Sequence, residues 1–432
     1  MKAYPSYQKN KNAEKVLLIG VRLPGYARKE AEESLEELEQ LAITAGAAVQ
    51  GALSQEIHRI DPAYFVGSGK VEEIAAKAKE LKCVTVLFDE DLSPSQNRNL
   101  EEAIKIKVVD RTGLILDIFA QRAKSREGKL QVELAQDLYL QSRLVGQWGH
   151  LSRQTGGIGT RGPGETQLEV DRRLVKDKIT RIKRELQRVA SAREIHRSRR
   201  SEVPIPTVSL VGYTNSGKST LMNALTQAGV LMEDKLFATL DPTVRRLKLP
   251  SGREVLLSDT VGFIRKLPHA LVESFKATFE EIQGADLLIH LMDISHPSRQ
   301  LQKTKVLEVL KDLKLDQKAI LEVYNKIDLM GYGLELNKND IGVSALRQEG
   351  LDKLLHKLDQ LLSKGFKSLT LKIPHQEGGL LSFLHRYGRI LKKEYQDDGV
   401  FMEVEVFQKF VKGLAKFKVK KQKGDPKISL CA

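Results

Sequence analysis

Residues 208–219 read Val-Ser-Leu-Val-Gly-Tyr-Thr-Asn-Ser-Gly-Lys-Ser, and their pattern indicates the fold class of the chain. The apolar residues 208–211 indicate a strand, and residues 221–225 after the loop favour a helix. Strand, glycine-rich loop and helix in this order are typical of a phosphate-binding loop, because glycines let backbone amides approach phosphate oxygens. An ordinary glycine turn is the alternative. The predicted loop comprises Gly212, Tyr213, Thr214, Asn215, Ser216, Gly217, Lys218 and Ser219.

Two loop side chains and a second motif complete the predicted phosphate site. Lys218 is expected to reach the outer phosphates, and the Ser219 hydroxyl to bind Mg²⁺. Further along, apolar residues 255–257 lead into a D-x-x-G motif. Its aspartate can hold Mg²⁺ through water, and its glycine amide can sense a γ-phosphate. The motif comprises Asp259, Thr260, Val261 and Gly262.

A third motif indicates which base is bound. Apolar residues 319–323 end in Asn325, Lys326, Ile327 and Asp328. The Asp328 carboxylate can accept hydrogen bonds from N1 and N2 of guanine, whereas adenine offers no matching pair of donors. A fourth strand, 341–343, runs into Ser344, Ala345 and Leu346, where a backbone amide can meet the guanine O6. Four motifs in order, each at a strand's carboxyl end, predict binding of GTP or GDP and hydrolysis of GTP.

The first switch of such a protein is expected between the phosphate loop and Asp259. The candidate nucleotide contacts there are Phe237, Ala238, Thr239, Leu240 and Asp241. Thr239 is predicted to supply the second Mg²⁺ hydroxyl, with Thr243 as the alternative in the same loop. A capped turn before a strand at 244–248 would be the non-functional interpretation. The predicted catalytic residues are therefore Lys218, Thr239 and Gly262.

Two positions bear on catalytic rate. Phe263 follows Gly262, and a phenyl ring cannot orient an attacking water as the switch glutamine of Ras-like enzymes does. Intrinsic hydrolysis should therefore be slow and stimulated by a partner. Asn215 occupies a place where some GTPases use asparagine to help coordinate K⁺, although a neutral loop filler is an equal alternative.

Length and pattern predict a multidomain α/β protein of 432 residues. We expect an N-terminal α/β domain at 1–115 and a helical hairpin with a glycine-rich loop at 116–201. A P-loop GTPase domain at 202–365 should contain a mostly parallel sheet with helices on both faces. A small α/β module at 366–432 follows, with an alternating run at Phe401, Val404 and Val406.

The predicted hairpin is apolar along one seam and basic elsewhere. Residues 172–200 contain twelve Lys or Arg and three Asp or Glu, which fits either phosphate contacts or a solvated helix face. The seam residues repeat at helical and heptad spacing. They are Leu130, Leu134, Leu138, Gln141 and Val145 on one helix, and Leu168, Val175, Ile179, Ile182, Leu186 and Val189 on the other.

Net charge, cysteine count and apolar runs indicate the kind of partner and the cellular location to expect. The net charge of +14 favours a polyanion, with nucleic acid ahead of a membrane surface. Cys83 and Cys431 are the only cysteines, too few for a disulfide framework or a zinc site. The sequence shows no signal-peptide pattern and no bilayer-spanning apolar run, so a cytoplasmic location is expected.

Residues 66–74, 154–167 and 237–243 carry sequence patterns beyond the general GTPase motifs. Through these segments the chain resembles the HflX family of translational GTPases. The resemblance extends over nearly the whole chain. It implies a monomeric GTPase that binds the large ribosomal subunit and its rRNA near the peptidyl-transferase region, with some members splitting stalled ribosomes. It implies no DNA partner and at most a peripheral membrane contact.

Two other functions are compatible with the sequence. One is a regulatory switch that acts on a protein or a membrane surface, since a basic amphipathic helix permits either. The other is a GTPase that assists ribosome assembly. Residues 67–70, Gly-Ser-Gly-Lys, lack the upstream glycine of a phosphate loop and do not predict a second nucleotide site.

Overall fold

A computed structural model describes residues 13–147, 163–201, 205–226, 236–237, 239–241, 243–266, 282–330, 336 and 340–419. The chain divides into two compact units. The first contains residues 1–191, 232–241 and 261–279, and the second contains residues 192–231, 242–260 and 280–432. The multidomain α/β class is confirmed, whereas the domain boundaries at residues 115, 201 and 365 stay predictions.

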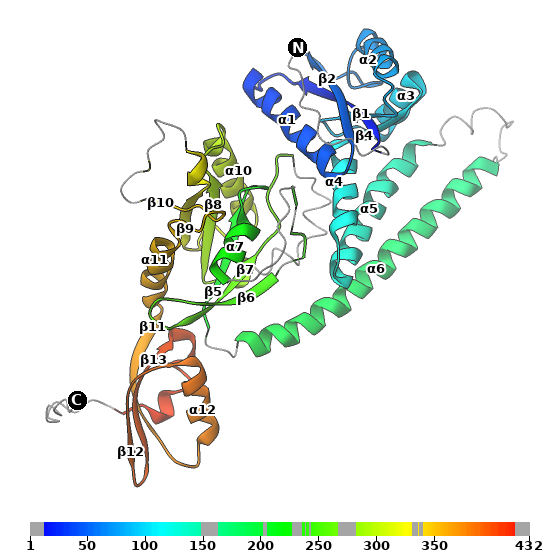
Figure 1. Ribbon diagram of the computed structural model, residues 1–432. Coiled ribbons are helices and arrows are strands. Elements are labelled where there is room, and N and C mark those ends of the chain that lie inside the picture. The colour runs from blue at the N-terminus through cyan, green and yellow to red at the C-terminus, as the bar shows by residue number, and fades with distance from the viewer. Residues whose placement is uncertain are drawn as a thin grey trace. The chain divides into compact units, whose positions relative to one another are not determined.

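The first unit opens with a four-stranded parallel sheet of order β2-β1-β3-β4 (Figure 1). Its strands are β1 (Lys15–Arg22), β2 (Ala48–Glu56), β3 (Thr85–Phe88) and β4 (Lys107–Asp110). The helices are α1 (Arg28–Thr44), α2 (Ser68–Glu80), α3 (Pro94–Ile104) and α4 (Arg111–Arg122). At the start of α3, the Ser93 side chain caps the Gln96 amide and the Gln96 side chain accepts from the Ser93 amide. The capping box predicted from this spacing is therefore present.

Two long helices follow, α5 (Arg126–Gln147) and α6 (Pro163–Ser201). They pack through Leu134, Ile179 and Ile182, flanked by the partly buried Leu130, Leu138, Val175 and Leu186. The predicted apolar seam is thus confirmed for these residues. The side chains of Val145 and Leu168 lie outside the described residues.

The second unit contains a six-stranded sheet of order β10-β9-β8-β5-β7-β6. The strands are β5 (Thr207–Gly212), β6 (Thr243–Lys248), β7 (Glu254–Asp259), β8 (Leu287–Asp293), β9 (Ile320–Asn325) and β10 (Ile341–Gly342). All neighbouring strands are parallel except β6 and β7, so the predicted mostly parallel sheet is confirmed.

Helices cover both faces of this sheet (Figure 1). One face packs against α7 (Lys218–Thr226) and α11 (Leu351–Ser363) in a single apolar cluster that includes Leu221, Leu291 and Leu354. The buried Val306 and Leu310 of α10 (Arg299–Asp312) lie outside that cluster, because α10 covers the other face. This arrangement directs the carboxyl ends of β5, β7, β8 and β9 toward one edge of the sheet.

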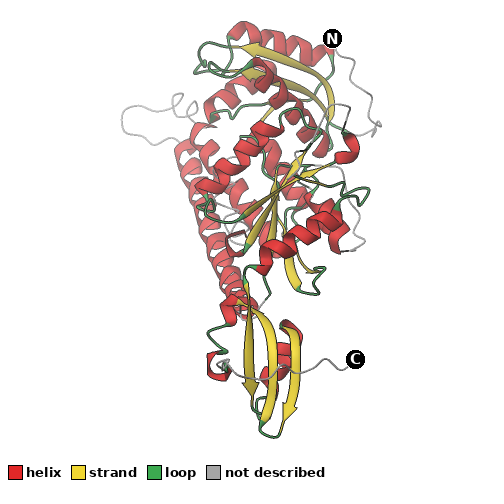
Figure 2. Cartoon of the chain, turned by 90° about the vertical axis from the view of Figure 1, so that its left-hand side faces the viewer, coloured by secondary structure: helices red, strands yellow, loops and turns green. Residues whose placement is uncertain are grey.

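The last part of the second unit is a three-stranded antiparallel sheet backed by a helix (Figure 2). It comprises β11 (Phe366–Ile373), α12 (Gly378–Tyr387), β12 (Arg389–Gln396) and β13 (Gly399–Phe407). The predicted alternation is partly wrong. Val404 and Val406 are buried with Val400 and Met402, whereas Phe401 is half-buried on the opposite face of β13. None of the described helices combines the length and apolar character that a bilayer-spanning segment requires.

Candidate functional site

The phosphate loop connects β5 directly to α7. Gly217 has φ +90°, and a Cβ added there would lie 2.2 Å from the Asn325 Nδ2, so the loop admits no side chain at this position. Asn215 is exposed and has φ +60°, a conformation that asparagine tolerates better than most residues. This backbone requirement explains an asparagine at residue 215 without any cation.

Lys218 lies inside the loop rather than in solvent. Its side chain is buried, and Nζ donates to the carbonyl oxygens of Gly212 at 3.1 Å and Tyr213 at 2.7 Å. Burial lowers the pKa of this ammonium to about 8, and the nearby Asp259 carboxylate opposes the shift. The Gly212 and Tyr213 carbonyl oxygens thus hold the ammonium group within the phosphate loop.

Ser219 and Asp259 form the hydroxyl–carboxylate pair expected of a magnesium site. Ser219 Oγ donates to Asp259 Oδ2 at 2.7 Å, and Asp259 is buried at the end of β7. The neighbouring Thr260 Oγ1 donates to the Leu210 carbonyl at 2.6 Å, which ties β7 to β5. Hydroxyl and carboxylate oxygens are the ligands that Mg²⁺ prefers, so this donor pair fits the ion.

Asn325 joins the phosphate loop to the predicted base-binding loop. Its Nδ2 donates to the Ser216 carbonyl at 2.8 Å, and its Oδ1 accepts from the Ala345 amide at 3.0 Å. One buried side chain therefore fixes two segments 129 residues apart, from Ser216 to Ala345, by holding both to β9. Lys326, at φ +64°, extends its Nζ to within 2.7 Å of Asp293 Oδ2 at the end of β8.

The predicted guanine-binding residues lie at the same edge. Asp328 lies in a short 3₁₀ turn, Ile327–Leu329, directly after β9. Ser344 is fully buried and its Oγ accepts from the Arg347 amide at 3.1 Å, while Leu346 is 72% exposed. The Ala345 and Leu346 backbone therefore follows a loop that β10, Asn325 and Ser344 hold in place.

Three buried polar atoms among these residues have no hydrogen-bond partner within the described part of the chain. They are Thr214 Oγ1, Ser216 Oγ and Asp328 Oδ1. Buried polar groups are rarely left unpaired in folded proteins, so such atoms indicate a ligand. All three belong to the motifs predicted from the sequence, and they suit phosphate oxygens and the guanine donors.

The segment predicted to be the first switch belongs to the first unit, where it makes contacts that the sequence did not indicate. The Phe237 ring packs edge-on against Phe119 of α4 with centroids 4.6 Å apart. The Asp241 carboxylate accepts from the amides of Lys124 at 3.0 Å and Ser125 at 2.7 Å, at the start of α5. Of the remaining predicted switch residues, Leu240 is buried, Thr239 is half-buried, and Ala238 lies outside the described residues.

The residues that follow Thr260 of the D-x-x-G motif also belong to the first unit. Val261 and Phe263 are buried on either side of Gly262. Phe263 is 3% exposed, so its ring packs as a core side chain.

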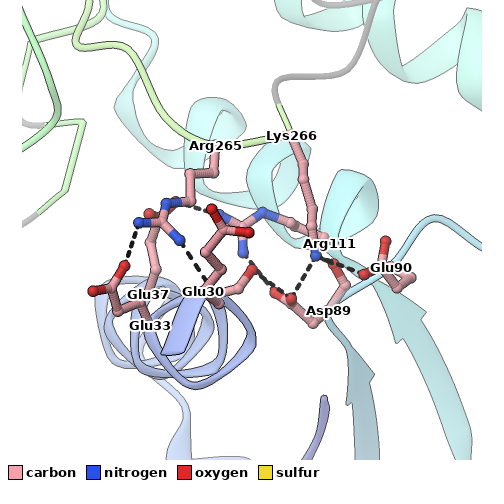
Figure 3. Close-up of polar contacts among 9 residues, drawn as sticks. Glu30, Glu33, Glu37, Asp89, Glu90, Arg111, Arg265 and Lys266 are labelled. Atoms are coloured by element: carbon pink, nitrogen blue, oxygen red, sulfur yellow. Dashed lines mark hydrogen bonds and ion pairs between the residues drawn. The ribbon is translucent and has the colours of Figure 1, made fainter. Parts of the chain in front are cut away.

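Beyond Phe263, two basic residues bind acidic residues of the N-terminal domain (Figure 3). Arg265 Nη2 lies 2.6 Å from Glu33 Oε2, and Lys266 Nζ lies 2.7 Å from both Asp89 Oδ2 and Glu90 Oε1. Sequence reasoning missed these residues. The available signal was the Arg-Lys pair two residues after the D-x-x-G motif and its phenylalanine.

Four family models match the chain in succession. Residues 32–120 match a GTP-binding GTPase N-terminal region, and residues 122–200 match a GTP-binding GTPase middle region. Residues 207–326 match a 50S ribosome-binding GTPase model, and residues 333–419 match the HflX C-terminal domain.

Known proteins resemble the chain over most of its length. It is 47% identical over 406 residues to GTPase HflX of Lacrimispora saccharolytica, covering 93% of this chain and 96% of that protein. It is 47% identical over 374 residues to GTPase HflX of Escherichia coli K12, covering 85% of this chain and 88% of that protein. A crystal structure of a GTP-binding protein from Sulfolobus solfataricus in complex with GDP has 24% sequence identity and a TM-score of 0.44. It covers 81% of this chain and 99% of that one.

The identity to these relatives, together with the phosphate-loop and guanine-motif geometry, confirms the resemblance seen in the sequence. GTP binding and GTP hydrolysis follow for this chain. It belongs to the HflX family of GTPases.

Proposed function

We propose that this GTPase associates with the large ribosomal subunit through rRNA when GTP is bound, and that it splits stalled ribosomes into subunits. The observation that carries the proposal is the basic outer side of α6. The matched family model, described as a 50S ribosome-binding GTPase, supports the same partner.

The outer side of α6 is a row of cations. Among the described side chains of this helix, the exposed basic residues are Arg173, Lys176, Arg181, Lys183, Arg184 and Arg188. Asp177 is the exposed acid between them, and the opposite side buries Ile179 and Ile182 against α5. An exposed row of Lys and Arg on a rigid helix suits the phosphate backbone of RNA, whose binding releases counterions and depends steeply on salt.

Different residues of the nucleotide site are proposed to contact the phosphates, the guanine base and Mg²⁺. We propose that the backbone of the phosphate loop and Lys218 hold the phosphates, and that Asp328 accepts hydrogen bonds from guanine. Ser219, Asp259 and Thr239 would hold Mg²⁺, which when bound neutralises charge that develops on the phosphate oxygens. Gly262 would sense the γ-phosphate through its amide. Phe263 supplies no hydrogen bond to an attacking water, so a partner should be needed for fast turnover.

Co-sedimentation tests ribosome association. Purified large subunits are pelleted with the protein and a non-hydrolysable GTP analogue over a range of salt concentrations. The variant Arg181→Glu with Arg184→Glu is expected to lose binding, because it reverses two charges of the row. The matched control Lys311→Glu with Lys314→Glu changes two exposed lysines, one in the last turn of α10 and one just beyond its end. Equal loss in both variants, or no loss in the first, contradicts the proposal.

Sucrose gradients test splitting. Intact ribosomes incubated with the protein and GTP should shift toward separate subunits, and GDP should leave them intact. An unchanged profile in the presence of GTP removes the splitting activity and leaves the GTPase in place. Preferential binding to immature over mature subunits would instead favour a role in assembly.

A potassium requirement is tested by turnover. The proposal of K⁺ at Asn215 predicts faster hydrolysis in potassium chloride than in sodium chloride at equal ionic strength. Equal rates would mean that Asn215 serves the φ +60° loop conformation alone.

A further inference from the structure

Asp241 completes the N-terminal cap of a helix that lies 116 residues earlier in the sequence. Ser125 precedes α5, and its Oγ accepts from the Gly128 amide at 2.9 Å, as an N-cap serine does. In a capping box, the third helical residue is Glu or Gln and returns a bond to the N-cap amide. Here that residue is Gly128, which has no side chain. The Asp241 carboxylate takes this role, because it accepts from the Ser125 amide at 2.7 Å and from the Ser125 hydroxyl.

Gly128 is what makes room for this arrangement. A Cβ added there would lie 2.3 Å from Asp241 Oδ1 and 3.1 Å from Ser125 Oγ. The distance to Asp241 is far below any normal contact, so an alanine would displace the carboxylate. Gly128 therefore leaves space at the N-terminus of α5 for the Asp241 side chain.

A second contact holds the same segment. The Phe237 ring, 2% exposed, packs edge-on against Phe119 of α4. Thr239, the candidate Mg²⁺ ligand, thus lies between two residues that both bind the helical part of the first unit. The carboxylate also lies at the positive end of the α5 dipole, which favours a negative charge there.

We propose that Asp241 is a positioning residue that couples the first switch, and with it Thr239, to the start of the α5–α6 hairpin. A change of switch conformation then removes the cap of α5. A force applied to the hairpin in turn biases the switch, because coupling between two sites is reciprocal. The effect of the switch on the α5 cap is the first half of the inference, and the effect of the hairpin on the switch is the second half. The second half rests on the proposed function, since the hairpin is the proposed ribosome-binding element.

The two halves are tested separately. The first measurement is hydrogen exchange of the Lys124 and Ser125 amides in the full chain, in GDP and in a GTP analogue. It requires nucleotide binding but no ribosome. Coupling predicts that amide protection at these two residues differs between the nucleotides. Identical protection overturns the inference, whatever the ribosome experiments show.

The variant Gly128→Ala sharpens this measurement. Alanine has a higher helix propensity than glycine, so α5 should remain folded in this variant while the Asp241 carboxylate is displaced. The nucleotide-dependent difference at Lys124 and Ser125 should disappear in this variant. The matched control is Gly69→Ala, which also changes a glycine in the first turn of a helix, at a place with nothing within 4 Å of the added Cβ. A nucleotide-dependent difference that persists in Gly128→Ala contradicts the inference.

Turnover tests the second half. If large subunits stimulate turnover of the wild-type protein, Gly128→Ala should lower the degree of stimulation about fivefold or more, with each protein compared with its own unstimulated rate. Ser125→Ala, which removes the hydroxyl but keeps the two amide bonds, should reduce it less. Stimulation equal to wild type in Gly128→Ala overturns the coupling. Wild-type protein that no subunit stimulates would refute the proposed function, and the exchange measurement would still decide the first half.

Discussion

Lys266 Nζ lies 2.7 Å from Asp89 Oδ2, which joins the segment after the D-x-x-G motif to the carboxyl end of β3. The same carboxylate accepts from Arg111 Nη1 and from Ser34 Oγ, both at 2.6 Å. Arg111 also pairs with Glu37, and only 1% of its side chain is exposed. Asp89 is therefore the shared acceptor of one buried and one partly exposed cation.

The two partners of this contact should differ in their effect on stability. Asp89→Ala leaves the buried Arg111 without one of its two carboxylates, which should cost about 3–5 kcal/mol of unfolding free energy. Lys266→Ala removes a side chain that is 28% exposed and leaves Asp89 paired with Arg111, so its cost should be about 1 kcal/mol or less. Scanning calorimetry of both variants measures the difference. Equal melting temperatures for the two would contradict this ranking.

Asp328 Oδ1, which has no partner among the described residues, is expected to determine base selectivity. Asp328→Asn places an amide donor where guanine presents its N2 donor, so GDP affinity should fall about tenfold or more. Xanthine carries a carbonyl at that ring position and should bind the variant better than guanine does. Competition of XDP and GDP against a fluorescent GDP analogue measures both affinities. An unchanged preference for GDP would show that Asp328 does not read the base.

His290 of β8 gives the GTPase domain a specific acid sensitivity. Burial lowers the pKa of this imidazole from 6.5 to about 4, the nearby Glu322 opposes the shift, and Nδ1 has no partner among the described residues. Below pH 6.5 the His290 imidazole binds a proton in the unfolded chain, whereas in the folded chain it binds one only near pH 4. Stability is therefore lost as the pH falls through this window, by about 3 kcal/mol.

Urea unfolding at a series of pH values measures this loss. His290→Leu should flatten the curve between pH 6.5 and 4 relative to wild type. His356→Gln, at an exposed position on α11, is the matched control and should follow the wild-type curve. A His290→Leu curve that runs parallel to wild type would assign the acid sensitivity to other groups.

Arg253 links the GTPase sheet to the C-terminal module. Its Nη1 lies 2.9 Å from Asp359 of α11 and its Nη2 lies 2.7 Å from Glu405 of β13, with the guanidinium 4.9 Å from the Phe366 ring centroid. Arg253→Lys cannot make both bonds, because an ammonium lacks the planar fork. Limited proteolysis should cut this variant faster near residues 364–366. Arg246→Lys, a change at an exposed ion pair on β6, is the control and should resist protease as wild type does.

Local patterns were enough to predict much of the fold. The strand–loop–helix order around Lys218 and the Ser93–Gln96 cap depend on neighbouring residues, so the sequence contains their signals. The mostly parallel sheet follows from alternating strands and helices. The seam between α5 and α6 was visible because helical spacing brings its residues to one side.

Contacts between distant segments could not be foreseen in the same way. Nothing in residues 237–241 indicates that Asp241 caps α5, because the capping role depends on the missing side chain at Gly128. Similarly, Arg265 and Lys266 have acidic partners near residues 30 and 90, and charge alone does not identify them. Phe401 was grouped with Val404 and Val406, although its side chain lies on the other face of β13. An aromatic residue on a half-exposed sheet face resembles a core residue in sequence.

GTP is expected to control association with the large ribosomal subunit, and co-sedimentation with separated subunits measures this dependence. The protein should pellet with large subunits in the presence of a non-hydrolysable GTP analogue, and should stay in the supernatant with GDP or with small subunits. Equal pelleting in the two nucleotides, or a preference for small subunits, would contradict the account.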